Sequence, residues 1–153
     1  MYRRFDFEGD IHSSLSCVPL TVRRKLDLAE LKISLAGWQS LERAERLALC
    51  HLPVDTAADL AVYREVLAGF AARAGVALTP LGGGPVEPAA WGAAGVLARV
   101  RERLGGAGDL DEARLGSLDE EERYALFKLA DPKRAPEKLR AALEELGFGP
   151  KAG

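Results

Sequence analysis

The sequence has little of what several protein classes require. Its two cysteines, Cys17 and Cys50, are too few for a disulfide framework and favour a reduced, intracellular setting. No run approaches the roughly 18 uncharged apolar residues of a membrane span. The acidic residues Asp6 and Glu8 interrupt the start, where a signal peptide would have its apolar core. We therefore expect a cytoplasmic protein with no membrane partner.

An excess of positive charge is also missing. The chain has 21 Lys and Arg against 23 Asp and Glu, a formal net charge of −2, whereas general nucleic-acid binders are basic. The triplet Arg23–Lys25 and the alternating Arg99, Arg101 and Arg103 fan over several faces of a helix, although a phosphate-binding stripe keeps to one face. We expect no nucleic-acid partner.

The residues that are present indicate a helical globular protein. The composition is 48% hydrophobic and 29% charged, and 153 residues suit one domain that folds without metal or disulfide. Strand signals are almost absent. We predict an all-α, single-domain bundle of about six helices over 1–153, with an extended arm at the alternating residues 5–8. The predicted helices cover about 19–29, 41–51, 56–74, 93–104, 118–130 and 136–146.

A Gly/Pro-rich loop at 76–88 is expected to join the two helical halves, about 5–75 and 89–147. Its three glycines at 82–84 do not form a phosphate-binding loop, because no Gly-Lys-Ser/Thr follows. A short extended link is expected at Leu31–Leu35.

Local signals set the expected ends of the N-terminal helices. Pro19 suits the first helical position, and a stripe of apolar side chains follows with helical spacing at Val18, Val22, Leu26 and Ala29. Ser40 is the expected cap of the second helix, and Pro53 would stop that helix. Thr56 with Asp59 resembles a capping box, and Gly75 is a natural residue to end the third helix after Ala74.

Similar signals occur in the C-terminal half. Gly105 and Gly106 would end the fourth helix, and Ser117 with Glu120 reads as the capping box of the fifth. That helix is apolar on nearly every side from Tyr124 to Ala130, so it should be buried. Pro136 should begin the last helix, whose stripe is Leu139, Ala142, Leu143 and Leu146. Gly147 and Phe148 suit a Schellman ending.

The soft metal ligands available are His12, Cys17, Cys50 and His51. Their spacing matches neither Cys-x₂₋₄-Cys nor His-x₃₋₅-His, and adjacent residues such as Cys50 and His51 rarely serve one ion on a helix. We predict no metal or cofactor. The alternative is a metal-binding or thiol redox sensor that uses Cys17 with Cys50 or His51. Otherwise Cys17 is a small buried residue, Cys50 lies beside a helix face and His51 lies near a helix C-terminus.

No catalytic constellation is recognised, so we expect no enzyme. Pairing of Cys17 with His51 has no local support as a nucleophile and base. The acidic run Glu120–Glu122 fits the first turn of a helix, where the helix dipole favours negative charge.

A dense polar cluster surrounds the first predicted helix, with a tryptophan not far along the chain. Either these residues form a contact surface for a protein partner, or they pair internally and hold the arm, although exposed pairs contribute only about 0–1 kcal/mol each. Trp38 and Trp91 suit packing or an interface. The candidate partner-binding residues are Glu8, Asp10, Arg23, Arg24, Lys25, Asp27 and Trp38.

Several motifs resemble the nitrate reductase-associated protein family, over most of 5–75 and about 117–146. This resemblance implies an accessory or interaction role in nitrate assimilation, with nitrate reductase as the candidate protein partner, and it brings no catalytic residues. The motifs are Phe5-x-Phe7-Glu8, Ser14-Leu15-x-Cys17-x-Pro19-x-x-Val22-Arg23-x-Lys25-Leu26-Asp27, Leu35-x-x-Trp38, Arg46-Leu47, Leu52-Pro53 and Arg123-Tyr124-Ala125-Leu126-x-Lys128-Leu129.

Overall fold

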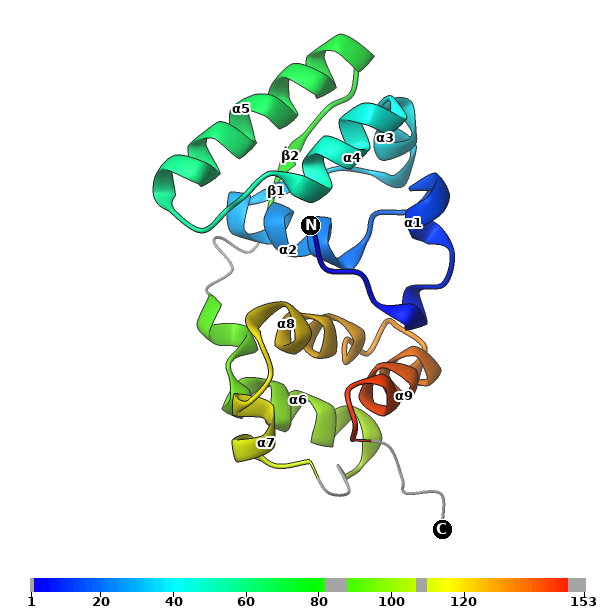
Figure 1. Cartoon of the computed structure of the whole chain (residues 1–153), viewed down its shortest axis with the longest axis vertical. Coiled ribbons are helices and arrows are strands. Elements are labelled where there is room, and N and C mark those ends of the chain that lie inside the picture. The colour runs from blue at the N-terminus through cyan, green and yellow to red at the C-terminus, as the bar shows by residue number, and fades with distance from the viewer. Residues whose placement is uncertain (1, 82–87, 107–109, 149–153) are drawn as a thin grey trace. The chain divides into compact units, whose positions relative to one another are not determined.

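The computed structural model describes residues 2–81, 88–106 and 110–148, and the protein is predominantly helical, as predicted (Figure 1). The chain divides into two compact units. Unit 1 comprises Met1–Arg4 and Glu8–Val86, and unit 2 comprises Phe5–Phe7 and Glu87–Gly153. The boundary between 86 and 87 falls inside the predicted loop 76–88. The expectation of one domain over 1–153 stays a prediction.

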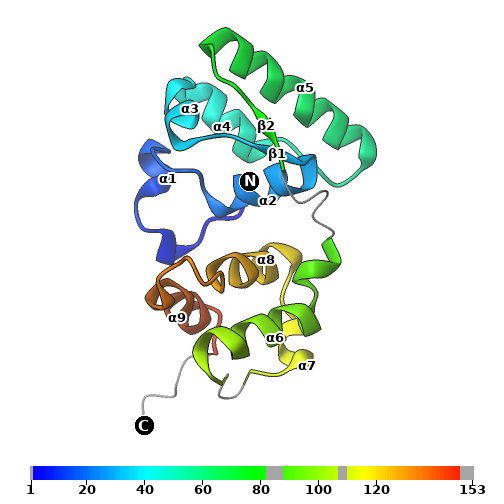
Figure 2. The ribbon, with the colours of Figure 1, turned by 180° about the vertical axis from the view of Figure 1, so that it is seen from behind.

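Unit 1 contains five α-helices and a small sheet within its described residues. Strands β1 and β2 lie side by side and antiparallel, with Leu31 opposite Pro80 (Figures 1 and 2). The elements are α1 (Ile11–Ser14), α2 (Leu20–Ala29), β1 (Leu31–Lys32), α3 (Leu35–Ser40), α4 (Arg43–His51), α5 (Ala57–Ala74) and β2 (Thr79–Pro80).

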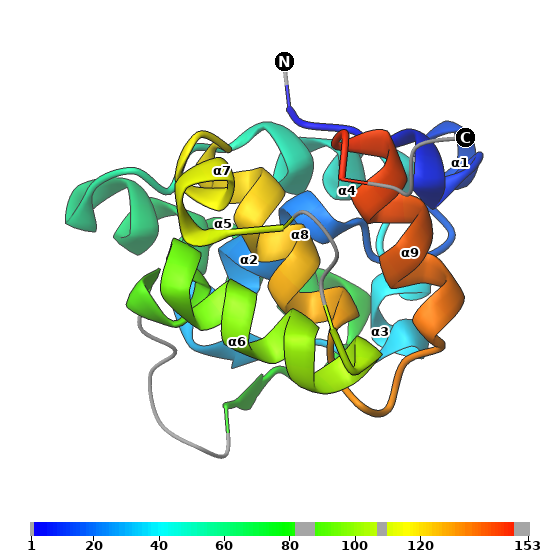
Figure 3. The ribbon, with the colours of Figure 1, turned by 90° about the horizontal axis from the view of Figure 1, so that it is seen from below.

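Unit 2 is built around α8. This helix packs against α6 and α9, and Figure 3 shows the three lying beside one another. The elements of unit 2 are η2 (Pro88–Trp91), α6 (Ala93–Leu104), α7 (Glu112–Gly116), α8 (Glu120–Leu129) and α9 (Pro136–Glu145). In the described residues, no helix is both long and apolar enough to cross a membrane.

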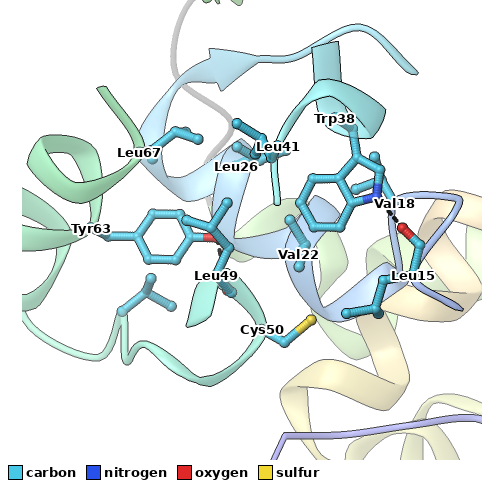
Figure 4. Close-up of a cluster of buried hydrophobic side chains, with 12 residues drawn as sticks. Leu15, Val18, Val22, Leu26, Trp38, Leu41, Leu49, Cys50, Tyr63 and Leu67 are labelled. Carbon is cyan, nitrogen blue, oxygen red and sulfur yellow. Dashed lines mark hydrogen bonds between the residues drawn. The ribbon is translucent and has the colours of Figure 1, made fainter. Parts of the chain in front are cut away.

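The core of unit 1 confirms the predicted stripe of α2. Val22 and Leu26 point into a cluster that also contains Trp38 and Tyr63 (Figure 4). The two aromatic side chains keep their polar atoms satisfied inside this core, because the Trp38 indole N–H donates to the carbonyl of Leu15 at 2.7 Å and the Tyr63 hydroxyl donates to the carbonyl of Leu49 at 3.0 Å.

The core of unit 2 confirms that the predicted apolar helix is buried. Tyr124, Leu126 and Ala130 are at most 1% exposed. Trp91, also 1% exposed, places its ring edge-on to Tyr124 with centroids 5.0 Å apart. Trp91 is therefore a packing residue of unit 2.

Several predicted helix ends are confirmed. Thr56 and Asp59 form the capping box of α5, and Gly75 ends that helix with a φ of +70°. Gly105 ends α6 with a φ of +71°, and Pro136 is the first residue of α9. The Schellman ending of α9 is present, because the amide N–H of Phe148 donates to the carbonyl of Leu143 at 2.8 Å.

The predicted extended arm is wrong. Asp6–Glu8 form a 3-10 turn, η1, and Gly9 then turns the chain into α1 with a φ of +69°. The alternation of Phe5 and Phe7 does not distinguish an extended strand from a turn. In this turn the two rings also lie on one side, and they stack with their centroids 5.1 Å apart. The Phe7 amide N–H donates to Glu145 Oε1 at 2.9 Å within unit 2.

Three predicted helix starts are displaced by one or two residues. Pro19 is the N-cap of α2 and not its first helical residue. Ser40 ends α3, where its hydroxyl donates to the carbonyl of Ala36, and Glu42 caps α4 instead. Ser117 follows α7, and Asp119 is the cap of α8.

The displacements at Ser40 and Ser117 share one cause. Helices of four to six residues, such as α1, α3 and α7, are too short for an apolar stripe to reveal them. The expected extended link at Leu31–Leu35 contains β1 and, at Leu35, the first residue of α3. Thr79, which was expected to lie in the loop 76–88, belongs to β2. The glycines at 82–84 lie outside the described residues.

The position of the cap of α8 can be tested by comparing Asp119→Ala with Ser117→Ala. Asp119 accepts a hydrogen bond from the amide N–H of Glu122 at 2.8 Å, whereas the Ser117 hydroxyl bonds only at the end of α7. We expect Asp119→Ala to lower the free energy of unfolding in urea by about 1 kcal/mol, and Ser117→Ala by less than about 0.5 kcal/mol. The reverse order would restore Ser117 as the cap.

Candidate functional site

The polar cluster around α2 is mostly inside the protein. Eight of the ten residues of α2 are buried, so its polar side is not a solvent-facing surface. Arg24 and Asp27 are each 7% exposed, Lys25 is 5% exposed and Trp38 is fully buried. Of the seven candidate partner-binding residues, Asp10 is exposed and Arg23 is half-buried.

Lys25 caps the end of α4. Its ammonium donates to the carbonyls of Cys50 at 2.6 Å and Leu52 at 2.5 Å. Carbonyls at a helix C-terminus lack partners within the helix, and the helix dipole favours a positive charge there. The buried charge of Lys25 is therefore compensated by the main chain, across 25 residues of sequence.

Glu8 performs the complementary task at the start of α2. The N-cap, Pro19, has no side-chain acceptor, and Glu8 Oε2 instead accepts from the Leu20 amide N–H at 3.0 Å. A carboxylate is favoured at a helix N-terminus. The Glu8 side chain is only 5% exposed, so this is an internal contact.

The second oxygen of Glu8 begins a partly buried chain of hydrogen-bonded side chains. Glu8 Oε1 lies 3.0 Å from His12 Nε2, and His12 Nδ1 lies 3.3 Å from the hydroxyl of Tyr2. Because a carboxylate only accepts, Nε2 carries a proton and donates to Glu8. In the neutral ring Nδ1 then accepts, which makes the Tyr2 hydroxyl the donor. Tyr2 was absent from the sequence-predicted set because its aromatic ring lies ten residues from His12 in the chain.

Leu15 is held in a strained conformation by this region. Its φ of +54° is left-handed, which costs about 1–2 kcal/mol for a side chain with a Cβ. The Leu15 carbonyl accepts from both Trp38 Nε1 at 2.7 Å and an Arg46 guanidinium nitrogen at 2.8 Å. These two hydrogen bonds, together with full burial of Leu15, offset the strain and explain why Trp38 lies inside.

A second link between helices, also missing from the sequence-predicted set, joins α4 to α5. The carboxylate of Glu45, buried on α4, forms a bidentate pair with the guanidinium of Arg73 on α5, and Arg73 Nε lies 2.9 Å from Glu45 Oε2. This hydrogen-bonded guanidinium is the main reason why the pKa of Glu45 lies below its usual value. The pair is a long-range contact with no periodic signal in the sequence.

The four possible metal ligands differ in burial. Cys17 is exposed and Cys50 is fully buried, and both thiols are free. The expectation of a buried Cys17 is therefore wrong, because Cys17 lies in the turn before Pro19 while Val18 and Pro19 take the inward positions. His51 ends α4, as expected, and is exposed. Within 2–81, 88–106 and 110–148, no group of three or more His, Cys, Asp or Glu residues could hold a metal ion.

Burial controls the thiol of Cys50. It raises the pKa of Cys50 to about 11, and the nearby ammonium of Lys25 opposes this only in part. The thiolate is the reactive form of cysteine, so Cys50 is inert near neutral pH while it stays covered.

Two of the three arginines of α6, Arg99 and Arg103, make internal contacts in unit 2, and Arg101 is exposed. The guanidinium of Arg99 lies 4.2 Å from the ring centroid of Phe127 and 3.6 Å from the carboxylate of Asp131. The pKa of Asp131 is lowered first by the Lys133 amide N–H and then by Arg99. Arg103 donates to the carbonyl of Arg134 at 2.9 Å.

The structural role of Lys25 is tested by Lys25→Met, with Lys32→Met on the exposed edge of β1 as the matched control. Loss of the ammonium leaves two main-chain carbonyls without their donor, so the free energy of unfolding should fall by about 1–3 kcal/mol. Lys32→Met should change it by less than about 0.5 kcal/mol. A Lys25→Met protein as stable as the native protein would contradict the structural role of Lys25.

Titration of Cys50 should make stability depend on pH. The pKa of this thiol is raised in the folded state, so its contribution to stability is complete below the unfolded-state pKa of about 9 and is lost as the pH rises toward about 11. Between about pH 8 and about pH 10, the native protein should lose about 1.4 kcal/mol more stability than Cys50→Ala. Urea unfolding of both proteins in reducing buffer measures this difference, and parallel pH profiles would contradict it.

Comparison with known proteins adds one match. Residues 4–146 match the family model described as conserved nitrate reductase-associated protein. The match includes the loop and α6, which the sequence motifs had left out. No curated protein and no solved structure matches the chain.

Proposed function

Because the chain belongs to the conserved nitrate reductase-associated protein family, we propose that it is a non-catalytic accessory protein that binds nitrate reductase or another component of nitrate assimilation. The family match over residues 4–146 is the observation that carries this proposal. The family description names an association and not a reaction, so the proposal concerns binding.

The contacts in unit 1 support a binding role over a catalytic one. The side chains that could act as catalytic acids or bases instead hold the fold together. Lys25 caps α4, Glu8 caps α2 and His12 joins Glu8 to Tyr2. A catalytic base or nucleophile must reach a substrate, and the side chains of Glu8 and His12 are 5% and 8% exposed. The free thiols suit a cytoplasmic setting for this role.

The proposed contact surface includes Asp10. Its carboxylate is exposed at the start of α1 and makes no capping hydrogen bond with that helix. The turn beneath it is fixed, because the Asp10 carbonyl accepts from both the amide and the hydroxyl of Ser13. An exposed charge on a fixed turn can guide a partner without first being ordered.

Direct binding tests the proposal. The purified protein is used as bait in extracts of nitrate-grown cells, and purified nitrate reductase is then titrated against it at about 50 mM and about 300 mM salt. We expect enrichment of nitrate reductase or another nitrate-assimilation protein, with weaker binding at high salt because exposed charges are screened.

Two charge reversals in unit 1 locate the surface. Asp10→Lys should weaken binding by about tenfold, whereas Asp55→Lys, at another exposed acid, should change it by less than about twofold. Equal effects of the two variants would move the contact surface away from Asp10. Absence of every nitrate-assimilation protein from the captured set, at each salt concentration, would overturn the accessory role itself.

A further inference from the structure

A basic surface of unit 2 lies where α8 turns into α9. This turn runs beside the C-terminal end of α6, because the guanidinium of Arg103 donates to the carbonyl of Arg134 at 2.9 Å (Figure 3). Lys133 precedes Arg134 in the turn, and Lys138 follows in the first turn of α9. Both lysines are exposed, and the two arginines are half-buried. These four residues, Arg103, Lys133, Arg134 and Lys138, form the α8–α9 surface.

Cations outnumber carboxylates at this surface. The carboxylate of Asp131 lies 3.6 Å from the guanidinium of Arg99, and the charges of Lys133 and Arg134 act on it as well. These cations help to lower the pKa of Asp131, after the Lys133 amide N–H, which has the largest effect. In the part of the chain that the structure describes, Lys133, Arg134 and Lys138 form no ion pair with a carboxylate. Like charges gathered in this way repel one another, so stabilisation of unit 2 does not explain them.

The turn that presents these cations is held in one shape by hydrogen bonds. The amide N–H of Lys133 donates to Asp131 Oδ1 at 2.9 Å, and that of Arg134 donates to the Asp131 carbonyl at 2.9 Å. The hydrogen bond from Arg103 to the Arg134 carbonyl then joins the turn to α6. A partner that binds here does not have to order the main chain, which lowers the entropic cost of binding.

We propose that the α8–α9 surface is a docking site for an acidic segment of a protein partner. Aspartate and glutamate side chains of the partner pair with Lys133 and Lys138, and a carboxylate accepts two N–H groups from the planar guanidinium of Arg134. The choice of a protein rests on the proposed accessory role, whereas the acidic chemistry rests on the surface itself. The site belongs to unit 2, and Asp10 belongs to unit 1.

The surface fits an acidic protein better than a nucleic acid or a membrane. A phosphate backbone needs a continuous stripe of cations, but Asp131 and the exposed Glu137 interrupt these cations, and the whole chain has a formal net charge of −2. Binding to a membrane surface combines basic charge with apolar anchors. Among the described residues, the exposed large hydrophobic side chains, Leu35 and Val62, belong to unit 1.

Titration of the full-length protein with a poly-glutamate peptide tests the surface independently of the natural partner. At about 50 mM salt we expect saturable binding, with the largest NMR amide shifts at residues 131–138. Lys133→Glu/Lys138→Glu should weaken this binding by more than about tenfold. Lys133→Gln/Lys138→Gln, which removes the charges without reversing them, should give a smaller loss in the same direction. The urea midpoint of each variant checks that it is folded.

A matched pair of charge reversals in unit 2 provides the control. Arg101→Glu/Arg140→Glu makes the same change in net charge at exposed cations that lie about 200° around their helices from Arg103 and Lys138. We expect this pair to weaken peptide binding by less than about twofold. Absence of saturable binding, or equal weakening by the two pairs of reversals, overturns the docking site.

Two other anions test the class of partner. An oligothymidylate and vesicles that contain phosphatidylglycerol are titrated at about 150 mM salt, where weak electrostatic contacts are screened. We expect neither to bind in a way that depends on Lys133 and Lys138. Binding of either that persists at this salt and is lost in Lys133→Glu/Lys138→Glu would replace the acidic protein by a nucleic acid or a membrane.

Purified nitrate reductase separates this inference from the accessory role. If it binds, Lys133→Glu/Lys138→Glu should weaken the complex by more than about tenfold and Arg101→Glu/Arg140→Glu by less than about twofold. Binding that both pairs leave unchanged refutes the docking site and retains the accessory role. If no nitrate-assimilation protein binds, the accessory role fails, and the peptide titration alone decides whether the surface takes an acidic segment.

Discussion

The ammonium group of Lys25 is the constraint on which the arrangement of unit 1 depends. It is a buried positive charge, and a buried charge is tolerated only when fixed partners compensate it. Its partners are the carbonyls at the end of α4, so α2 must lie across that end. Once α2 is held there, the faces that carry Val22 and Leu26 complete the core with Trp38 and its neighbours.

Two charged side chains of unit 1 compensate helix ends of opposite polarity, the N-terminus of α2 and the C-terminus of α4. Glu8 provides the acceptor that Pro19 cannot provide at the N-terminus, and Lys25 provides the donor that the C-terminal carbonyls of α4 need. Both side chains reach their helix ends from other segments of the chain, so each cap is also a tertiary contact. The polar cluster thus stabilises the fold from within, and the proposed contact surface uses an exposed group, Asp10.

The two cysteines differ in their exposure to solvent. Cys17 lies in a turn in front of α2 and is exposed, whereas Cys50 lies in the last turn of α4, beneath Tyr2. Cys50 is a member of the buried core cluster, against which the ring of Tyr2 packs, whereas Cys17 lies outside that cluster. Family membership supports the proposal of a protein partner.

The sequence by itself determined the helices whose signals are local. The start of α5 at Thr56, its end at Gly75 and the start of α9 at Pro136 depend on hydrogen bonds and backbone preferences within a few residues, which is why they were predictable. It also drew attention to the residues of the polar cluster. Only the tertiary structure decided their roles, because the contacts join Lys25 to Cys50, Trp38 to Leu15 and Glu8 to Leu20 over 25, 23 and 12 residues. Burial and partner choice at such distances depend on how helices pack, and periodicity along one helix carries no record of that packing.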